Sequence, residues 1–116
     1  AFWSEKKIRE MARKQLGLFH SAIQSLKIGG TLVYSTCTFA PEENEAIVDQ
    51  ILKKYGTAIE VVEVKIPEPD TEQGIRQWRN LQFNEQVSRA CRIVPDSLFE
   101  GFFICKMVKT NVTHSL

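Results

Sequence analysis

Several protein classes are excluded by what this sequence lacks. Its three cysteines, Cys37, Cys91 and Cys105, are an odd number without paired spacing, so they predict neither a disulfide framework nor a zinc site. No apolar run approaches the roughly 18 residues of a membrane helix, and the first residues contain no hydrophobic region of a signal peptide. We therefore expect an intracellular, cytoplasmic protein (nucleolar in a eukaryote) that binds neither a membrane nor a metal.

The sequence also has little net charge and no familiar nucleotide-binding signature. Lysine and arginine number 15 against 14 aspartates and glutamates, so no overall field indicates a nucleic-acid partner, although a local basic patch suffices for RNA. No Walker motif, glycine-rich nucleotide loop or Ser-His-Asp set occurs. The length of 116 residues predicts one small domain or part of a larger one.

The first half of the sequence predicts a helix, a strand and a second helix. Apolar residues recur at three- and four-residue steps over residues 5–27, and two glycines end that helix. Residues 31–36 are nearly all apolar or β-branched, which is the pattern of a central strand covered on both faces. A second helix begins at Pro41, with glutamates in its first turn, and ends at Gly56.

The second half predicts strands separated by a long loop. Residues 58–66 form a strand whose charges suit a sheet edge, and residues 101–109 form a clearly apolar strand. Residues 67–87 carry only weak signals and are interpreted as a loop. The remaining predictions are a helical turn at residues 83–88, a short strand at 91–94 and a frayed tail at 110–116.

These elements predict an α/β fold arranged as half of a doubly wound sheet. The first strand, the second helix and the next strand form a parallel crossover. The last two strands are joined without a full helix, so the final strand is expected to be antiparallel. A half sheet of this kind leaves one side of its best strand unpaired. We therefore expect the 116 residues to be a part of a larger domain.

Cys37 is the first candidate for chemistry. It lies between Thr36 and Thr38 at the carboxyl end of a predicted strand, where open α/β sheets bind ligands. The N-terminus of the following helix, which favours a reactive thiolate, would lie a few residues away. The alternative is that Cys37 is a small buried hydrophobe, as most free cysteines are. Cys91 and Cys105 are expected to pack in the core.

The segment after Cys37 supports two compatible interpretations. Pro41, Glu42, Glu43 and Asn44 make a good helix start on their own terms. They would also support the loop that holds Cys37 and shape the electrostatic field at its thiol, although inward-pointing carboxylates would oppose thiolate formation.

Arginines and aromatic residues are interleaved between residues 74 and 92. Because arginine contacts phosphate and aromatic rings stack on unpaired bases, this pattern predicts an RNA-facing surface. The alternative is a solvated loop that Trp78 and Phe83 hold against the core. The candidate RNA contacts are Arg76, Trp78, Arg79, Arg89 and Arg92.

Two runs, LKIGGTLVYSTCT at residues 26–38 and PEENE at residues 41–45, form a specific combination. It is accompanied by GIRQW at residues 74–78, RIVP at 92–95 and GFF at 101–103. With these motifs the chain resembles, over nearly its whole length, the RNA cytosine-C5 methyltransferases of the NOL1/NOP2/Sun (Fmu) type. Asp96 departs from the family pattern, which has a histidine after the proline, and this affects a peripheral position only.

The resemblance implies a fold, a reaction and a nucleophile. The fold is the C-terminal half of a Rossmann-like class I methyltransferase sheet, with its last strand antiparallel. In that family the cysteine of the Thr-Cys-Thr motif, here Cys37, adds as a thiolate to C6 of a cytosine. C5 then takes the methyl group of S-adenosylmethionine, and loss of the C5 proton with elimination of the thiol releases 5-methylcytosine in tRNA or rRNA.

The cofactor-binding parts of that family, and the cysteine that assists product release in its Pro-Cys motif, have no counterpart in these residues. The glycine-rich loop after strand one, the acidic residue after strand two and the Pro-Cys motif after strand four cannot be assigned to any position. We therefore expect residues 1–116 to be a partial catalytic domain that binds no cofactor itself. Its partners would be RNA and the N-terminal half of the methyltransferase, which would bind most of the S-adenosylmethionine. The chain alone is expected to be inactive.

The sequence leaves two alternatives to this function. A non-catalytic relic or assembly module would pair with another chain through its open sheet edge. A thiol-based redox protein is the weaker one, because no Cys-x-x-Cys motif accompanies Cys37.

Overall fold

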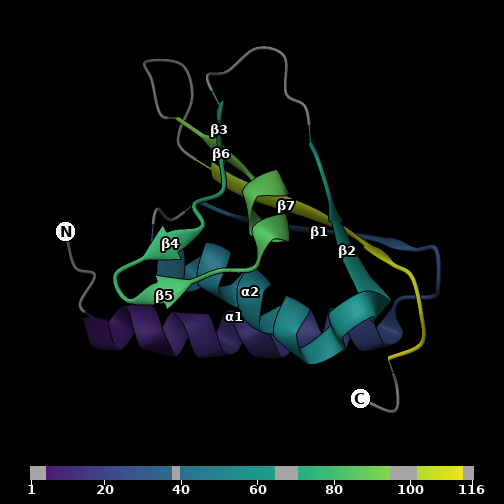
Figure 1. Cartoon of the computed structure of the whole chain (residues 1–116). Helices are drawn as coiled ribbons and strands as arrows, with labels where there is room; N and C mark the ends of the chain where they lie inside the picture. Colours follow the sequence, from purple (N-terminus) through teal and green to yellow (C-terminus); the bar gives the residue numbers. More distant parts are fainter. Residues whose placement is uncertain (1–4, 38–39, 65–70, 95–101, 114–116) are drawn as a thin grey trace.

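The structure, a computed structural model, describes residues 5–37, 40–64, 71–94 and 102–113 (Figure 1). The helices are α1 (Glu5–Ser25) and α2 (Glu45–Tyr55), and the short 3₁₀ turns are η1 (Pro41–Glu43), η2 (Gly56–Ala58) and η3 (Glu85–Arg89). The strands are β1 (Thr31–Thr36), β2 (Ile59–Val62), β3 (Thr71–Gln73), β4 (Gln77–Trp78), β5 (Leu81–Gln82), β6 (Cys91–Ile93) and β7 (Phe102–Lys109). None of the helices described is long and apolar enough to cross a membrane.

Strand β7 lies at the centre of the main sheet. Its Val108 pairs with Thr31 of β1 and with Glu60 of β2, so these two strands occupy opposite edges of β7. Strand β6 pairs with the first part of β7, and β3 pairs with β6. Every pair is antiparallel, which confirms the prediction for the last strand. Strands β1 and β2 therefore run in the same direction, as expected, with β7 between them.

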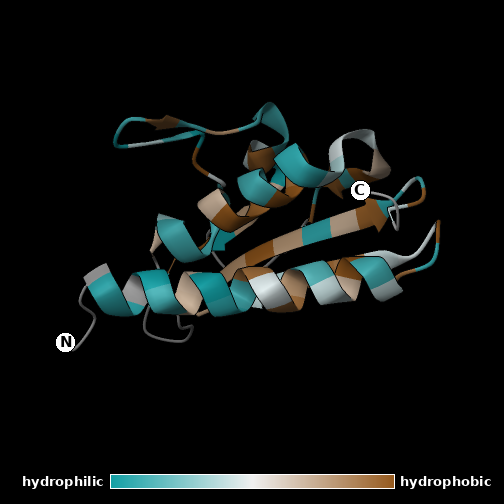
Figure 2. Cartoon of the chain, turned by 90° about the horizontal axis from the view of Figure 1, so that it is seen from below, coloured by the Kyte–Doolittle hydropathy of each residue, from teal (hydrophilic) through white to brown (hydrophobic). Residues whose placement is uncertain are grey.

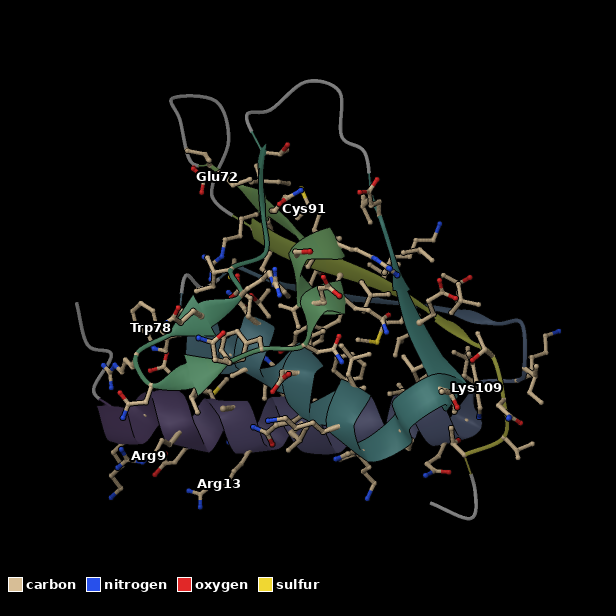
Figure 3. All side chains as sticks on the ribbon, in the orientation of Figure 1. Arg9, Arg13, Glu72, Trp78, Cys91 and Lys109 are labelled. Atoms are coloured by element: carbon tan, nitrogen blue, oxygen red, sulfur yellow. The ribbon has the colours of Figure 1, made fainter. Side chains whose placement is uncertain are left out.

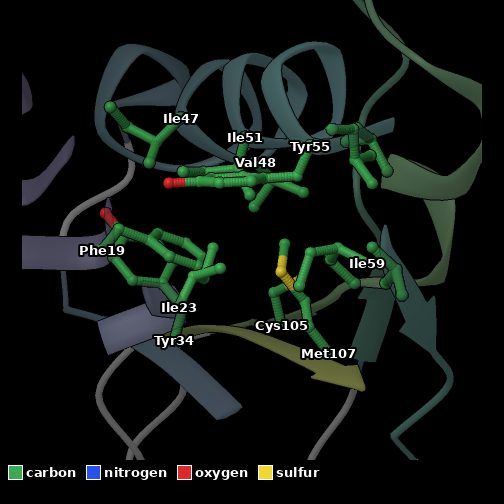
Figure 4. Packing of buried hydrophobic residues seen from close by; sticks show 14 of the residues in the cluster. Phe19, Ile23, Tyr34, Ile47, Val48, Ile51, Tyr55, Ile59, Cys105 and Met107 are labelled. Atoms are coloured by element: carbon green, nitrogen blue, oxygen red, sulfur yellow. The ribbon is translucent and has the colours of Figure 1, made fainter. Parts of the chain in front are cut away.

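Both helices cover one face of this sheet and enclose the core (Figure 1). Hydrophilic and hydrophobic residues alternate along α1, as an amphipathic helix requires (Figure 2). Phe19 and Ile23 of α1, Ile47 of α2, and Cys105 and Met107 of β7 are all buried, and they face one another in Figure 4. Burial of each large apolar side chain stabilises the fold by roughly 1.5–3 kcal/mol.

Lys109 joins the end of β7 to the end of α1. Its buried Nζ donates hydrogen bonds to the carbonyl oxygens of Ile23 (2.9 Å) and Leu26 (2.5 Å). A cation at a helix C-terminus also complements the helix dipole. Gly29, with a φ of 86°, turns the chain here, and its N–H donates to the carbonyl of Lys109 (2.7 Å). These contacts hold the start of β1 in place. Because β1 is a short, extended strand, they also help to place its other end, which Cys37 follows directly.

The expectation that residues 31–36 are covered on both faces is wrong for the part of the chain that is described. Tyr34 is buried, whereas Thr31, Val33 and Ser35 on the other face are exposed, Val33 by 57%. Both helices lie on a single face, and β1 pairs with β7 alone among the described strands. An apolar strand therefore has one face and one edge without a cover in these residues.

Two predicted segments differ in detail from the structure. The helix expected from Pro41 to Gly56 is divided, because Asn44, with φ −117° and ψ −96°, separates η1 from α2. The predicted loop at residues 67–87 contains β3 and the β4–β5 hairpin among its described residues. These strands are only two or three residues long and largely exposed, so no alternation of apolar residues marks them. The expected helical turn is confirmed as η3.

The tail that was predicted to fray is anchored as far as Thr113. The N–H of Thr110 donates to the carbonyl of Ala58 (2.8 Å), and its Oγ1 donates to the carbonyl of Thr57 (2.5 Å). Thr113 is buried. Residues 114–116 lie outside the described residues.

Candidate active site at the end of strand β1

Cys37 directly follows β1, and its side chain is exposed. Its position is the carboxyl end of a strand that runs parallel to β2, which is the place where α/β sheets bind ligands. The exposure argues against the alternative that Cys37 is a buried hydrophobe. Thr38, a predicted member of the supporting loop, lies outside the described residues.

Two hydrogen bonds join the strand before Cys37 to the turn after it. Tyr34 donates from Oη to the carbonyl oxygen of Glu43 at 2.6 Å, and both residues are buried. Thr36 donates from Oγ1 to Oδ1 of Asn44, whose side chain is fully buried. The loop that begins at Cys37 is therefore held where it leaves the strand and where it enters η1.

Tyr34 is a rigid anchor for this arrangement. Its ring stacks on Phe19 of α1 with 4.7 Å between ring centroids, and it meets the edge of Phe103 at 6.3 Å. Burial, followed by the negative charge of Glu43, raises the pKa of the Tyr34 hydroxyl. The hydroxyl therefore stays protonated and can donate its hydrogen bond over the whole neutral range.

The turn after the loop contains the remaining predicted supporting residues. Pro41 is buried at the first position of η1, where the fixed φ of proline suits a helical start. At the base of the loop, Thr36 is bonded to Asn44 and Tyr34 to Glu43, and the N–H of Asn44 donates to the carbonyl oxygen of Pro41 (3.1 Å). Glu42, by contrast, is half-buried and faces a groove beside α1.

A buried ion pair fixes the start of α2, and the sequence did not reveal it. The carboxylate of Glu45 is fully buried and accepts hydrogen bonds from Nε (2.5 Å) and Nη2 (2.6 Å) of Arg92 on β6. It also accepts the N–H of Ile75 (3.1 Å). The guanidinium lies over the ring of Phe103, 6.0 Å from its centroid. Because both carboxylate oxygens are bonded, this pair can hold α2 in one position against the sheet.

Two of the predicted RNA contacts lie on the β4–β5 hairpin. Arg76 and Arg79 are exposed, and the Arg79 guanidinium lies over the ring of Trp78, 5.6 Å from its centroid. Trp78 is half-buried against the core and Phe83 is buried in it. The two aromatic residues thus hold this segment against the core, as the alternative interpretation predicted, while the arginines remain at the surface.

The other two arginines point elsewhere, so the four do not form one surface. Arg89 is directed toward β2, where its Nη1 donates to the carbonyl of Val61 (2.9 Å) and lies 3.7 Å from a carboxylate oxygen of Glu60. Arg92 binds Glu45, and only 15% of its side chain is exposed. The geometry therefore gives Arg92 a role inside the fold.

The two remaining cysteines are buried, as predicted. Burial raises the pKa of the Cys91 thiol, although a hydrogen bond with Thr71 opposes this, and burial with the charge of Glu45 raises the pKa of Cys105 to about 12. Both therefore remain protonated and shielded. Among the described residues, no group of three or more histidine, cysteine, aspartate or glutamate side chains could hold a metal ion.

Comparison with solved structures places this arrangement in a known fold. A methyltransferase homologue protein from Pyrococcus horikoshii superposes with a TM-score of 0.79 and 31% identity, over 92% of this chain and 33% of that one. The structure of NSun6 from Pyrococcus horikoshii with SFG gives a TM-score of 0.69 and 32% identity, over 94% of this chain and 25% of that one. The chain therefore has the α/β methyltransferase fold.

Sequence comparison identifies the family. The tRNA (cytosine(49)-C(5))-methyltransferase of Pyrococcus abyssi is 41% identical over 108 residues, which cover 92% of this chain and 34% of that protein. The ribosomal RNA small subunit methyltransferase F of Aeromonas salmonicida is 37% identical over 107 residues, or 92% of this chain and 21% of that protein. The chain thus spans about a third or less of the length of these relatives. A family model described as 16S rRNA methyltransferase RsmB/F matches residues 2–108, and the chain belongs to this family of RNA cytosine-C5 methyltransferases.

Proposed function

We propose that this chain is the part of an S-adenosylmethionine-dependent RNA cytosine-C5 methyltransferase that carries the nucleophile, Cys37. The observation that carries the proposal is the exposed thiol at the end of β1, on a loop held by the Thr36–Asn44 and Tyr34–Glu43 hydrogen bonds. A nucleophile needs both features, because it must reach the substrate and must be held in one geometry.

The chain's own residues would act in the addition and elimination steps. The Cys37 thiolate attacks C6 of the target cytosine, and the electron pair of the C5–C6 double bond makes C5 nucleophilic. S-adenosylmethionine, when bound, supplies the methyl group that C5 takes. A base takes the C5 proton, the electron pair of that C–H bond re-forms the C5–C6 double bond, and the C6–S bond breaks to release Cys37 as a thiolate. Thr36, Pro41, Glu43 and Asn44 position the loop during these steps, as Thr38 would by its place beside Cys37.

The residues of this chain do not fit a complete cofactor site. Neither the family's glycine-rich loop after strand one nor its acidic residue after strand two can be assigned within the 116 residues. We infer that sequence beyond these residues, present in relatives about three times as long or longer, binds S-adenosylmethionine. The 116 residues alone would then have no methyltransferase activity.

RNA is the proposed substrate, and both tRNA and rRNA methyltransferases occur among the relatives. Arg76 and Arg79 remain candidates for RNA contact because they are exposed at the β4–β5 hairpin. Trp78 would support Arg79 through the contact between its ring and the guanidinium. Arg89 would contact RNA only through the exposed part of its guanidinium, because its Nη1 already donates a hydrogen bond to the carbonyl of Val61 in β2. We do not propose Arg92 as an RNA contact, because it pairs with the buried Glu45 and only 15% of its side chain is exposed.

A methylation assay tests this function. The full-length protein that contains this chain is incubated with tRNA or rRNA and S-adenosylmethionine, and 5-methylcytosine is measured by mass spectrometry of nucleosides. We expect Cys37→Ala to abolish the product, whereas Cys91→Ala, which removes a buried thiol, retains it. The 116-residue chain alone should give no product. Product formation by Cys37→Ala at the unsubstituted rate would refute the proposed role of Cys37.

One observation favours a second candidate, the assembly module. The free edge of β1 and its exposed Val33 could pair with a strand of another protein without any chemistry. The same assay separates the two functions, because an assembly module gives no 5-methylcytosine even as the full-length protein.

A further inference from the structure

Basic residues are concentrated in the first half of α1, although the whole chain has a net charge of only +1. Five of the 15 lysine and arginine residues occur within residues 6–14, and all five are exposed. The one acidic residue in that segment is Glu10. This segment therefore carries a local positive field that the composition of the whole chain conceals.

Three of these side chains share one face of the helix. Lys6, Arg9 and Arg13 follow one another at steps of three and four residues, which places them in a row about 10 Å long. Figure 3 shows Arg9 and Arg13 projecting from α1 away from the sheet. Glu10, four residues after Lys6 and three before Arg13, borders this face and offsets part of its charge. We call these three residues the basic row.

The basic row lies at the same end of the molecule as the candidate active site. Helix α1 and strand β1 run in opposite directions, so the start of α1 is at the same end of the molecule as the end of β1 (Figure 1). The turn η1, which follows the Cys37 loop, packs against α1. An open groove of about 330 Å³ is lined by Arg9 and Arg13 of the row, Glu42 of η1 and Leu81 of β5.

This groove lies where α1, the turn η1 and the β4–β5 hairpin meet. Its guanidinium side comes from α1, and its exposed apolar residue is Leu81, which is 52% exposed at the hairpin that also carries Arg79. Its third side, Glu42, is five residues after Cys37. Two guanidiniums against one carboxylate leave the groove positively charged, so it complements an anionic chain rather than a neutral ligand.

We propose that the basic row and this groove bind the phosphate backbone of single-stranded RNA next to the target cytosine. The proposal rests on the proposed function, because it adds an RNA path to the same site. Arg9 and Arg13 contact neighbouring phosphates through paired N–H groups, and Leu81 packs against a ribose or base. A protein partner fits less well, because the centres of protein interfaces are depleted in charged residues.

The salt dependence of RNA binding tests this proposal. The full-length protein is titrated into a fluorescent single-stranded RNA at several concentrations of KCl between about 50 and 200 mM. Each phosphate contact on a single strand contributes about −0.7 to the slope of log K against log salt, so Arg9→Gln/Arg13→Gln should make the slope less negative by about 1.4. Glutamine and arginine have similar helix propensities, so α1 should be preserved.

Two further variants serve as controls. Lys27→Gln/Lys53→Gln also removes two positive charges, from exposed lysines near the C-terminal ends of α1 and α2, far from the basic row. This variant should leave the slope near that of the unsubstituted protein. Arg9→Lys/Arg13→Lys keeps the charge and should keep most of the slope. An unchanged slope in the glutamine variant, or an equal loss in the control pair, would overturn the proposal.

The outcome is independent of the test of the nucleophile. A protein that methylates RNA through Cys37 but shows no change of slope in Arg9→Gln/Arg13→Gln contradicts the basic row alone. A protein that makes no 5-methylcytosine in any form contradicts the proposed function itself. A protein partner on α1 would leave the RNA slope unchanged and so counts against the proposal.

Discussion

The three cysteines of this chain differ in their exposure to solvent. Cys37 is exposed beyond the end of β1, whereas Cys91 and Cys105 point from β6 and β7 into the interior. Sequence reasoning separated them correctly, because Cys105 alternates with apolar residues along a strand and Cys37 ends one. Burial is therefore the property that distinguishes a candidate nucleophile from two core residues.

This difference predicts selective chemical labelling. Iodoacetamide at about pH 8 should modify one thiol of the folded protein, Cys37, whereas denaturant should allow modification of Cys91 and Cys105 as well. The reason is that the thiolate reacts, and burial raises the pKa of both other thiols, that of Cys105 from 9.0 to about 12. Raising the pH to about 10 should still leave Cys105 protonated and unlabelled. Mass spectrometry of peptides measures the result, and labelling of Cys105 as fast as Cys37 would contradict it.

At the scale of elements, the start of α2 depends on a pair of charges that are far apart in the sequence. Glu45 opens α2, and Arg92, 47 residues later, belongs to β6. Asn44 precedes Glu45 and accepts the hydrogen bond from Thr36. The ion pair therefore helps to hold the turn that supports the Cys37 loop.

The pair predicts a marked loss of stability when one partner is removed. Arg92→Met leaves the buried Glu45 carboxylate unpaired and should lower the free energy of unfolding by about 3–5 kcal/mol. Glu45→Gln/Arg92→Met removes both charges and should recover a large part of that loss. Urea unfolding followed by circular dichroism measures both.

A matched arginine provides the control for this measurement. Arg89→Met removes a guanidinium that is 44% exposed and pairs with the exposed Glu60, so its loss should cost about 1 kcal/mol or less. An equal effect of Arg89→Met and Arg92→Met would mean that the buried pair contributes nothing special to the fold.

The elements that could be predicted from sequence are those whose signal is local. Periodicity marks α1 and α2, and an apolar run marks β1 and β7. The β4–β5 hairpin and β3 have no such run, because pairing with a neighbour forms them. The Glu45–Arg92 pair and the Thr36–Asn44 hydrogen bond likewise depend on tertiary contacts, so only the residue types, and not the partners, were predictable.

At the scale of the whole molecule, the sheet order β1–β7–β2 leaves β1 at an edge. The apolar and β-branched residues of β1 are typical of a strand that is covered on both faces. Val33, however, is 57% exposed in these residues. The family relatives are about three times as long or longer. This agrees with the expectation that the 116 residues are part of a larger domain and with the proposal that sequence beyond them binds the cofactor.

At this scale, the net charge of the chain does not describe how its cations are distributed. A balance of +1 conceals the basic row on α1, which only a view of the helix face and its position beside η1 reveals. Residues 6–14 are rich in cations, but the fold alone places them at the end of the molecule that holds Cys37.

The central claim is that Cys37 forms the covalent bond to the target cytosine, and trapping tests it most directly. RNA that contains 5-fluorocytosine retains fluorine where the C5 proton would leave, so the thiol adduct cannot be eliminated. The full-length protein, S-adenosylmethionine and this RNA should give a protein–RNA band on a denaturing gel. We expect Cys91→Ala to keep that band and Cys37→Ala to lose it. A band of equal intensity with Cys37→Ala would contradict the claim.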